Sequence, residues 1–225
     1  MGEPLGLRAR KKEQTRLVIA EAARRLFAER GFETVTVAEV ARAADVSEGT
    51  VFNYFPTKED LFYSGMESFE ASLVEAVRDR PVGESVLEAF ERFVVDQSRG
   101  LAERAEVIEA AVQMVNSSPR LRAREREVVA RYTDSLAQLL AEETSSDGIE
   151  PVVVANALMG AQRALVDDVR TQISNGLRGA KLTARAKVEA RRGFERLEHG
   201  LADYDVKGAT GRRRHGARAG RCSGS

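Results

Sequence analysis

The chain has 225 residues and an apolar fraction of 43%, which is enough to bury a core in one or two domains. We expect no membrane span, because no apolar run reaches about 18 residues, and no secretory signal, because no apolar segment follows the basic N-terminus. The formal net charge is zero, but residues 206–225 carry six basic residues and no acidic one. The single cysteine, Cys222, favours a reducing cytoplasm.

Residues 1–11 are expected to form a basic, flexible arm. Between positions 8 and 16 the basic residues are Arg8, Arg10, Lys11, Lys12 and Arg16, and Glu13 is the one acidic residue. A local basic cluster suits a nucleic-acid partner more than the overall charge does. A solvated, frayed terminus would carry the same residues, so this pattern alone leaves the partner open.

A first helix is predicted over residues 12–30, where apolar residues recur at the spacing of one helix face. Gly31 is placed to end that helix. Thr36 and Glu39 form a capping-box pattern, which predicts the start of a short helix of about two turns.

A tight break at residues 45–46 follows, and Ser47 is placed to cap a second short helix. Pro56 stops that helix. From Thr57 the pattern predicts one long helix that runs to about Arg80.

The rest of the chain predicts four or five more helices and an all-α fold. Their approximate spans are 83–102, 104–116, 119–143, 151–175 and 183–204. Residues 206–225 are rich in Gly, Arg and Ser and are expected to be a disordered basic tail.

Two short helices that are joined by a tight turn and braced by a longer helix are the ingredients of a helix-turn-helix. The outward face of the second short helix would carry Ser47, Glu48, Gly49, Thr50, Asn53 and Tyr54. Its hydroxyl, amide and phenol groups can meet base edges and phosphates in a major groove. A generic three-helix bundle with a polar face would show the same pattern.

The run from Thr36 to Phe62, above all its YFPTKEDL ending, closely resembles the N-terminal domain of the TetR/AcrR family of bacterial transcriptional regulators. The resemblance covers residues 12–62. It implies a helix-turn-helix DNA-binding domain at 12–65 and a larger helical bundle at 66–205 for dimerisation and ligand binding.

The resemblance also implies roles for individual residues. Ser47, Gly49, Thr50 and Asn53 would face the groove, Thr36, Tyr54 and Lys58 would hold phosphates, and Arg16 would add a basic contact. This sequence departs from the family in two places. Asp45 replaces a glycine that is usual in the turn, and Asp tolerates a left-handed backbone better than most residues. The pair Val51–Phe52 replaces a Leu–Tyr pair and is expected to preserve the packing.

The C-terminal half matches the family only in architecture. In the helix predicted at 151–175, apolar residues at helical spacing are Val154, Leu158, Ala161, Leu165 and Val169, and small residues are Ala155, Ala157, Gly160 and Ala164. They could fill an intramolecular core. Because the family dimerises through its last two helices, we expect part of them to form a homodimer face.

A small-molecule effector is also expected from the resemblance. The candidate ligand-binding residues are Phe69, Phe90, Phe93, Met114, Tyr132, Met159 and Gln162, with Arg163 and Asn116 as polar anchors. Ordinary core packing is the favoured explanation for each of these aromatic and Met residues, because such side chains at helical spacing are typical of a core.

Nothing in the sequence predicts an enzyme, a catalytic residue, a metal site or a cofactor. The two histidines are His199 and His215, and Asp167 and Asp168 would point about 100° apart on a helix. We therefore expect a cytoplasmic regulator, associated with the nucleoid when it is bound to double-stranded DNA. It would be a repressor that a small molecule releases from an inverted-repeat operator. The alternative is a DNA-binding regulator with no small-molecule inducer, constitutive or architectural in its action.

Overall fold

The computed structural model describes residues 6–200, and over that range the chain is all-α, as the sequence predicts. Ten helices follow one another along the described residues: α1 (Leu7–Arg30), α2 (Val37–Ala43), α3 (Glu48–Tyr54), α4 (Lys58–Phe62), α5 (Met66–Arg78), α6 (Val86–Gln97), α7 (Leu101–Ser117), α8 (Pro119–Thr144), α9 (Glu150–Ser174) and α10 (Gly179–His199). The tail predicted at 206–225 lies outside the described residues. None of the described helices has the length and apolar character that a membrane crossing requires.

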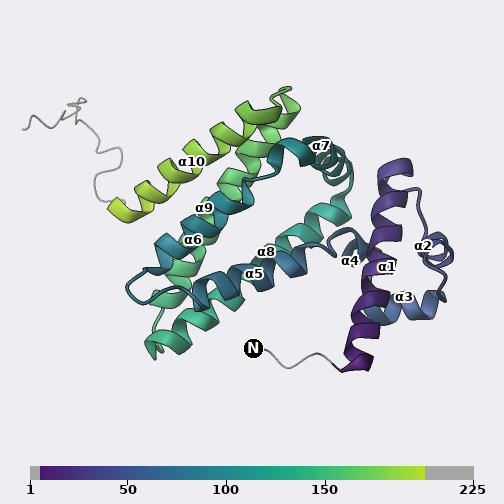
Figure 1. Ribbon diagram of the computed structural model, residues 1–225, viewed down its shortest axis with the longest axis horizontal. Helices are drawn as coiled ribbons and strands as arrows, with labels where there is room; N and C mark the ends of the chain where they lie inside the picture. The colour runs from purple at the N-terminus through teal and green to yellow at the C-terminus, as the bar shows by residue number, and fades with distance from the viewer. Residues whose placement is uncertain (1–5, 201–225) are drawn as a thin grey trace, which may run out of the picture.

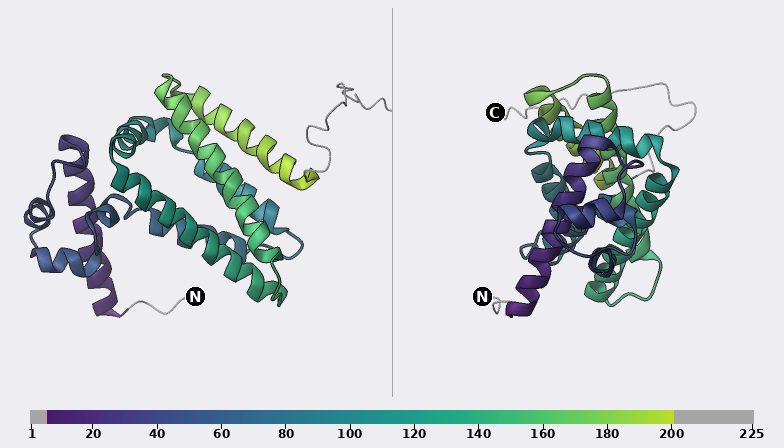
Figure 2. Two further views of the ribbon diagram at one scale, coloured as in Figure 1. Left: turned by 180° about the vertical axis from the view of Figure 1, so that it is seen from behind. Right: turned by 90° about the vertical axis from the view of Figure 1, so that its right-hand side faces the viewer.

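Helices α1 to α4 form an N-terminal unit at one end of the molecule (Figure 1). Its core contains Ile19 and Phe27 from α1, Val40 from α2, Val51 from α3 and Leu61 from α4. These apolar residues face inward because each helix carries them on one side. Helices α2 and α3 lie on the side of α1 that faces away from the other helices (Figures 1 and 2).

Helices α5 to α10 form the larger bundle, in which α8 and α9 cross and α10 packs along α9 and α6 (Figure 2). Its main core is built around Phe90, Phe93, Tyr132, Leu136 and Leu158. Ser118 caps α8, which has proline at its first position, and Pro151 is buried in the first turn of α9.

The structure corrects two predicted boundaries. The first helix begins at Leu7, so residues 7–11 of the expected flexible arm are helical. The helix predicted from Thr57 to Arg80 is two helices, because α4 ends at Phe62. Gly65, a poor residue for a helix interior, precedes α5 at this break, and the Tyr63 side chain beside it is buried, with its hydroxyl donating a hydrogen bond to the Leu121 carbonyl at 3.0 Å.

The N-terminal unit is docked on the corner where α7 meets α8. Val115 from α7 and Leu121 from α8 belong to the N-terminal core, although they are far from it in sequence. An ion pair between Arg124 on α8 and Asp60 on α4 lies beside this contact. The corner therefore holds α4 against the larger bundle.

Candidate nucleic-acid interface

The turn between α2 and α3 has the backbone that a helix-turn-helix requires. Asp45 lies in the left-handed region at φ 54°, which confirms the prediction that Asp tolerates this conformation in place of glycine. The Ser47 hydroxyl then accepts a hydrogen bond from the Thr50 N–H at 3.0 Å and caps α3. The turn is therefore set by residues that are close to one another in sequence.

The predicted capping box at α2 is present. The Thr36 hydroxyl accepts from the Glu39 N–H, and the Glu39 carboxylate accepts from the Thr36 N–H at 2.8 Å. Arg30 on α1 pairs with the same carboxylate at 2.8 Å. The hydrogen bond from the Thr36 backbone, followed by that from Arg30, lowers the pKa of Glu39 to about 2. A carboxylate therefore already lies at the N-terminus where a phosphate is expected.

The outward face of α3 carries groups that are free to meet a partner. Asn53 and Gly49 are exposed, and the Asn53 amide makes no hydrogen bond within the described residues. The Ser47 and Thr50 hydroxyls lie 2.8 Å apart and form a hydrogen bond with each other. Tyr54 is half-buried at the edge of this face. The structure thus brings five of the expected DNA-binding residues onto one short helix and its cap.

The Val51–Phe52 pair packs only in part as predicted. Val51 is fully buried, whereas Phe52 is 46% exposed. The expectation that this pair preserves the packing is therefore wrong for Phe52. Consecutive residues on a helix point about 100° apart, so Phe52 points away from the direction in which Val51 is buried. That geometry is the signal that sequence reasoning missed.

Lys58 and Arg16 both make contacts inside the N-terminal unit. The Lys58 ammonium donates to the Glu33 carbonyl at 3.3 Å and lies over the Phe32 ring, and burial lowers the pKa of Lys58. The Arg16 guanidinium donates to the Ser64 carbonyl at 3.3 Å and lies over the Phe55 ring. Both cations have structural partners, and their contacts with DNA stay predictions.

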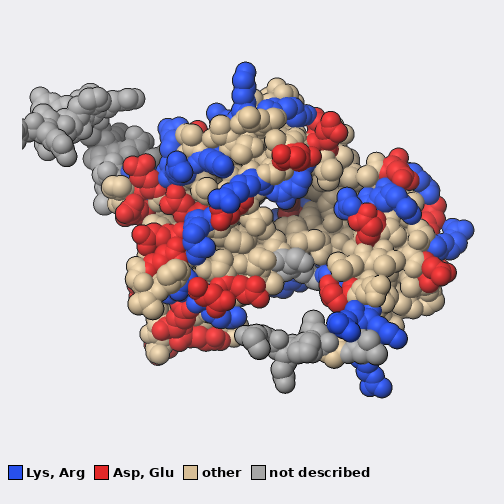
Figure 3. Space-filling model, in the orientation of Figure 1, with Lys and Arg blue, Asp and Glu red and all other residues tan. Residues whose placement is uncertain are grey.

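Basic side chains gather where α1 begins. Arg8, Arg10, Lys11 and Lys12 are all exposed there. Figure 3 shows Lys and Arg side chains around this lower end of the N-terminal unit, whereas acidic and basic side chains alternate over the larger bundle. These basic side chains at the start of α1 would attract a polyanion such as DNA to the N-terminal unit, which also carries α3.

The expected ligand-binding residues do not converge on one site. Phe69, Phe93 and Tyr132 form one aromatic cluster, with ring centroids 5.2 Å apart for Phe69 and Phe93 and 6.4 Å apart for Phe69 and Tyr132. Phe90 and Met159 belong to the same core, but Met114 packs against the N-terminal core instead. Most of the seven therefore serve as packing.

Gln162 is the one amide among the seven. Its side-chain carbonyl oxygen is buried and has no hydrogen-bond partner among the described residues. Buried polar groups are normally paired with protein, water or a ligand. The two expected anchors, Arg163 and Asn116, are both exposed.

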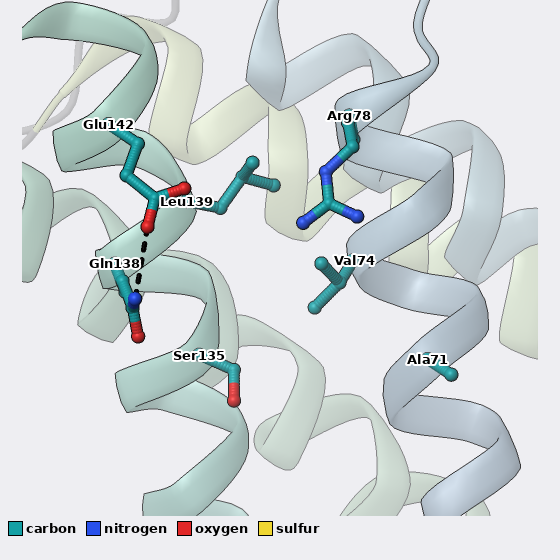
Figure 4. A pocket seen from close by; sticks show the side chains of 7 residues that line it. All are labelled: Ala71, Val74, Arg78, Ser135, Gln138, Leu139 and Glu142. Carbon is teal, nitrogen blue, oxygen red and sulfur yellow. Dashed lines mark hydrogen bonds between the residues drawn. The ribbon is translucent and has the colours of Figure 1, made fainter.

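A groove of about 360 Å³ lies between α5 and α8 and is lined by other residues. Figure 4 shows Arg78 reaching from α5 toward α8 over Val74 and Leu139. Gln138 donates to Glu142 at 3.0 Å on the opposite wall. The groove therefore has an apolar floor and a charged rim.

The structure separates the two faces of α9. Ala155 and Leu158 are buried in the larger bundle, whereas Ala157, Gly160 and Ala164 are exposed in a row. Val153 extends the row at 56% exposure. Three of the four predicted small residues, together with Val154 of the predicted apolar stripe, are thus available to a second molecule.

The acidic pair on α9 has no catalytic arrangement. Asp168 pairs with Arg185 at 3.0 Å, and Asp167 lies 3.9 Å from Arg170, so the two carboxylates serve different cations. The Nδ1 atom of exposed His199 lies 2.7 Å from the Glu195 carbonyl. Within residues 6–200, no group of His, Cys, Asp and Glu side chains is placed to hold a metal ion.

Comparisons with known proteins agree with this geometry. Residues 19–64 match the family described as bacterial regulatory proteins, tetR family. The regulator TcmR of Streptomyces glaucescens is 34% identical over 85 residues, which are 38% of this chain and 38% of TcmR. The nucleoid occlusion factor SlmA of Mannheimia succiniciproducens is 33% identical over 66 residues, 29% of this chain and 31% of SlmA. The matched segment spans less than half the length of these relatives.

The likeness to solved structures extends over most of the chain. FadR of Thermus thermophilus, a transcriptional repressor solved in complex with lauroyl-CoA, has a TM-score of 0.55 and 23% identity. It covers 87% of this chain and 100% of its own. At this identity the likeness concerns the fold.

Proposed function

This chain belongs to the TetR family of bacterial regulatory proteins, and from that premise we propose that it is a sequence-specific DNA-binding regulator. DNA binding is assigned to residues 12–65, and dimerisation and effector binding to residues 66–205. The finer form of the proposal is a homodimeric repressor that a small molecule releases from an inverted-repeat operator.

The observation that carries the proposal is the outward face of α3. Val51 is buried beneath it, and Asn53 projects an amide that has no hydrogen-bond partner within the described residues. An amide in this position can pair bidentately with adenine in the major groove. The exposed basic residues at the start of α1 add charge that favours phosphate backbone.

The first test compares contacts with bases and with the backbone. Asn53→Ala should weaken binding to the selected duplex by about 1–3 kcal/mol, and much less to a scrambled duplex. Tyr54→Phe should weaken both duplexes similarly, by about 1.5–3 kcal/mol, because a phosphate contact carries no base information.

The measurement is binding of both variants at one fixed salt concentration to a duplex that the wild-type protein has selected from a random library. The proposal predicts that this duplex contains an inverted repeat. Equal losses on both duplexes for Asn53→Ala would remove the base-reading role. If the wild-type protein selected no sequence from the library, the proposal that it is a sequence-specific regulator would be contradicted.

An effector is supported by two features of the larger bundle. The buried oxygen of Gln162 has no partner among the described residues, and the groove between α5 and α8 offers apolar and charged walls. Lauroyl-CoA, which the FadR structure contains, is a first probe. A compound that raises the melting temperature and also releases DNA would support an induced repressor.

The alternative function is DNA binding without an inducer. It is favoured by the match to SlmA, whose name describes nucleoid occlusion. The duplex-binding and effector-release measurements described above distinguish these two functions. A protein that binds many duplexes with similar affinity, and that no metabolite releases, would be architectural.

A further inference from the structure

Two pairs of opposite charges face each other where α5 and α8 end. Arg80 on α5 and Glu143 on α8 form an ion pair at 2.7 Å. Arg78 and Glu142 line the groove between the same two helices, and neither has an ion-pair partner among the described residues. The structure therefore leaves one guanidinium and one carboxylate open at the same end of the groove.

The two open charges lie on opposite walls. Figure 4 shows the Leu139 side chain between the Arg78 guanidinium and the Glu142 carboxylate. Gln138, one turn before Glu142, donates a hydrogen bond to that carboxylate at 3.0 Å and so orients it from its own helix. A small molecule can therefore lie between the two charges and contact both.

The rest of the groove is apolar or lined by short side chains. Val74 and Leu139 form its floor, and Ala71 and Ser135 line the end away from the charges. Ala71 and Arg78 are seven residues apart on α5, so this wall runs for about 10 Å. The volume of about 360 Å³ lies at the small end of the range that ligand sites occupy. The groove thus suits a small molecule with an apolar body and polar groups at one end.

The two open charges determine which polar groups fit. A simple carboxylic acid would pair with Arg78 but would also meet the Glu142 carboxylate, which repels it. A simple amine would pair with Glu142 but would also meet Arg78. A molecule that carries both a carboxylate and an ammonium can pair with both walls at once.

Resting on the effector-binding role proposed above for the larger bundle, we propose that this groove binds an apolar α-amino acid. The carboxylate of the ligand accepts hydrogen bonds from Arg78, and its ammonium donates to Glu142. Its side chain lies along Val74 and Leu139, where burial of apolar area adds affinity. Both charged groups of an α-amino acid are attached to one carbon, so its apolar side chain extends away from the charged end as the groove requires.

The test is calorimetric titration of the full chain, without DNA, with L-phenylalanine and with L-leucine. Each amino acid is compared with the acid that lacks its ammonium and with the amine that lacks its carboxylate. At least one of the two amino acids should bind, about tenfold more tightly than either of its analogues, because each analogue leaves one charge of the groove unpaired.

Two variants assign the binding to the groove. Arg78→Gln should weaken binding of the amino acid about tenfold and remove its advantage over the amine. Glu142→Gln should weaken binding similarly and remove the advantage over the acid. The thermal transitions of both variants without ligand should match that of the wild type, since both side chains are exposed and lack an ion-pair partner among the described residues.

Arg126→Gln on α8 and Glu106→Gln on α7 are the matched controls, because both residues are exposed and lie outside the groove. Each should bind the amino acid as the wild type does. The inference would be overturned if neither amino acid bound, if the analogues bound equally well, or if binding survived Arg78→Gln unchanged. If it were overturned while another compound released DNA, the effector function would stand at a different site. If the amino acid bound as expected but left the operator complex intact, the inference would stand and its role as the releasing effector would fail.

Discussion

At the scale of single residues, Glu39 shows how one carboxylate organises the start of the helix-turn-helix. It accepts from the Thr36 N–H and pairs with Arg30 from α1, so it fastens α2 to the preceding helix. A DNA phosphate at the N-terminus of α2 would therefore lie beside the Glu39 carboxylate, which already accepts a backbone N–H there. Because the Thr36 hydroxyl is hydrogen-bonded to Glu39, we expect DNA to contact the backbone beside Thr36 more than this hydroxyl.

The depressed pKa of Glu39 gives a prediction about pH. In the folded protein this pKa is about 2, below its ordinary value of 4.5, so the ionised form stabilises the fold. The stabilisation is present above about pH 4.5 and is lost as the pH falls toward 2. Glu39→Gln should therefore lower the melting temperature at pH 7, and the difference from the wild type should shrink on acidification.

Thermal unfolding between pH 7 and pH 2.5 measures this difference. Glu29→Gln, at an exposed position on α1, is the control and should leave the melting temperature almost unchanged at every pH. A difference for Glu39→Gln that stays constant from pH 7 to pH 2.5 would contradict the role of the ionised carboxylate.

At the scale of elements, the junction of α4 with α8 determines where the N-terminal unit sits. Asp60 caps α4 through Thr57 and at the same time pairs with Arg124 on α8. The next residue on α8, Glu125, pairs with Arg170 on α9. These pairs connect the start of α4 through α8 to the helix that is expected to dimerise.

Removing Arg124 should loosen this junction. The pair is largely shielded, since the Arg124 and Asp60 side chains are 28% and 13% exposed. Arg124→Ala should lower the free energy of unfolding by about 1–2 kcal/mol, between the values typical of exposed and buried pairs. It should also weaken DNA binding, because α4 carries Lys58.

Arg126→Ala, at an exposed position on α8, is the control for denaturation and DNA binding. Identical behaviour of the two variants would contradict the structural role of the pair.

At the scale of the whole molecule, the exposed row on α9 is where we expect a second copy to bind. A side chain added at Gly160 would meet no atom within 4 Å in the single chain. Gly160→Arg should therefore fold as a monomer while it prevents close approach of a partner. Dimerisation and operator binding should fail together, because two α3 helices must be spaced to match two half-sites.

Light scattering at micromolar concentration and operator binding test this expectation. Ala130→Arg, at an exposed small residue on α8, is the matched control and should remain dimeric. A dimeric Gly160→Arg protein that binds DNA normally would place the interface elsewhere.

The sequence by itself determined the features that depend on nearby residues. The capping box at Thr36, the cap at Ser47 and the left-handed turn at Asp45 involve groups no more than four positions apart, so local pattern was enough to predict them. The order of the helices and the helix-turn-helix followed in the same way. These features located the outward face of α3.

Only the tertiary structure decided where the helix predicted from Thr57 is interrupted and whether the Phe52 side chain is covered. Where the helix predicted from 57 to 80 is interrupted, the buried Tyr63 hydroxyl donates a hydrogen bond to the carbonyl of Leu121, a residue 58 positions away. Phe52 stays exposed, whereas Val51 and Phe55 are buried among residues of α1 and α2. Such outcomes depend on competition between side chains for a limited buried area, and residues distant in sequence supply the competitors.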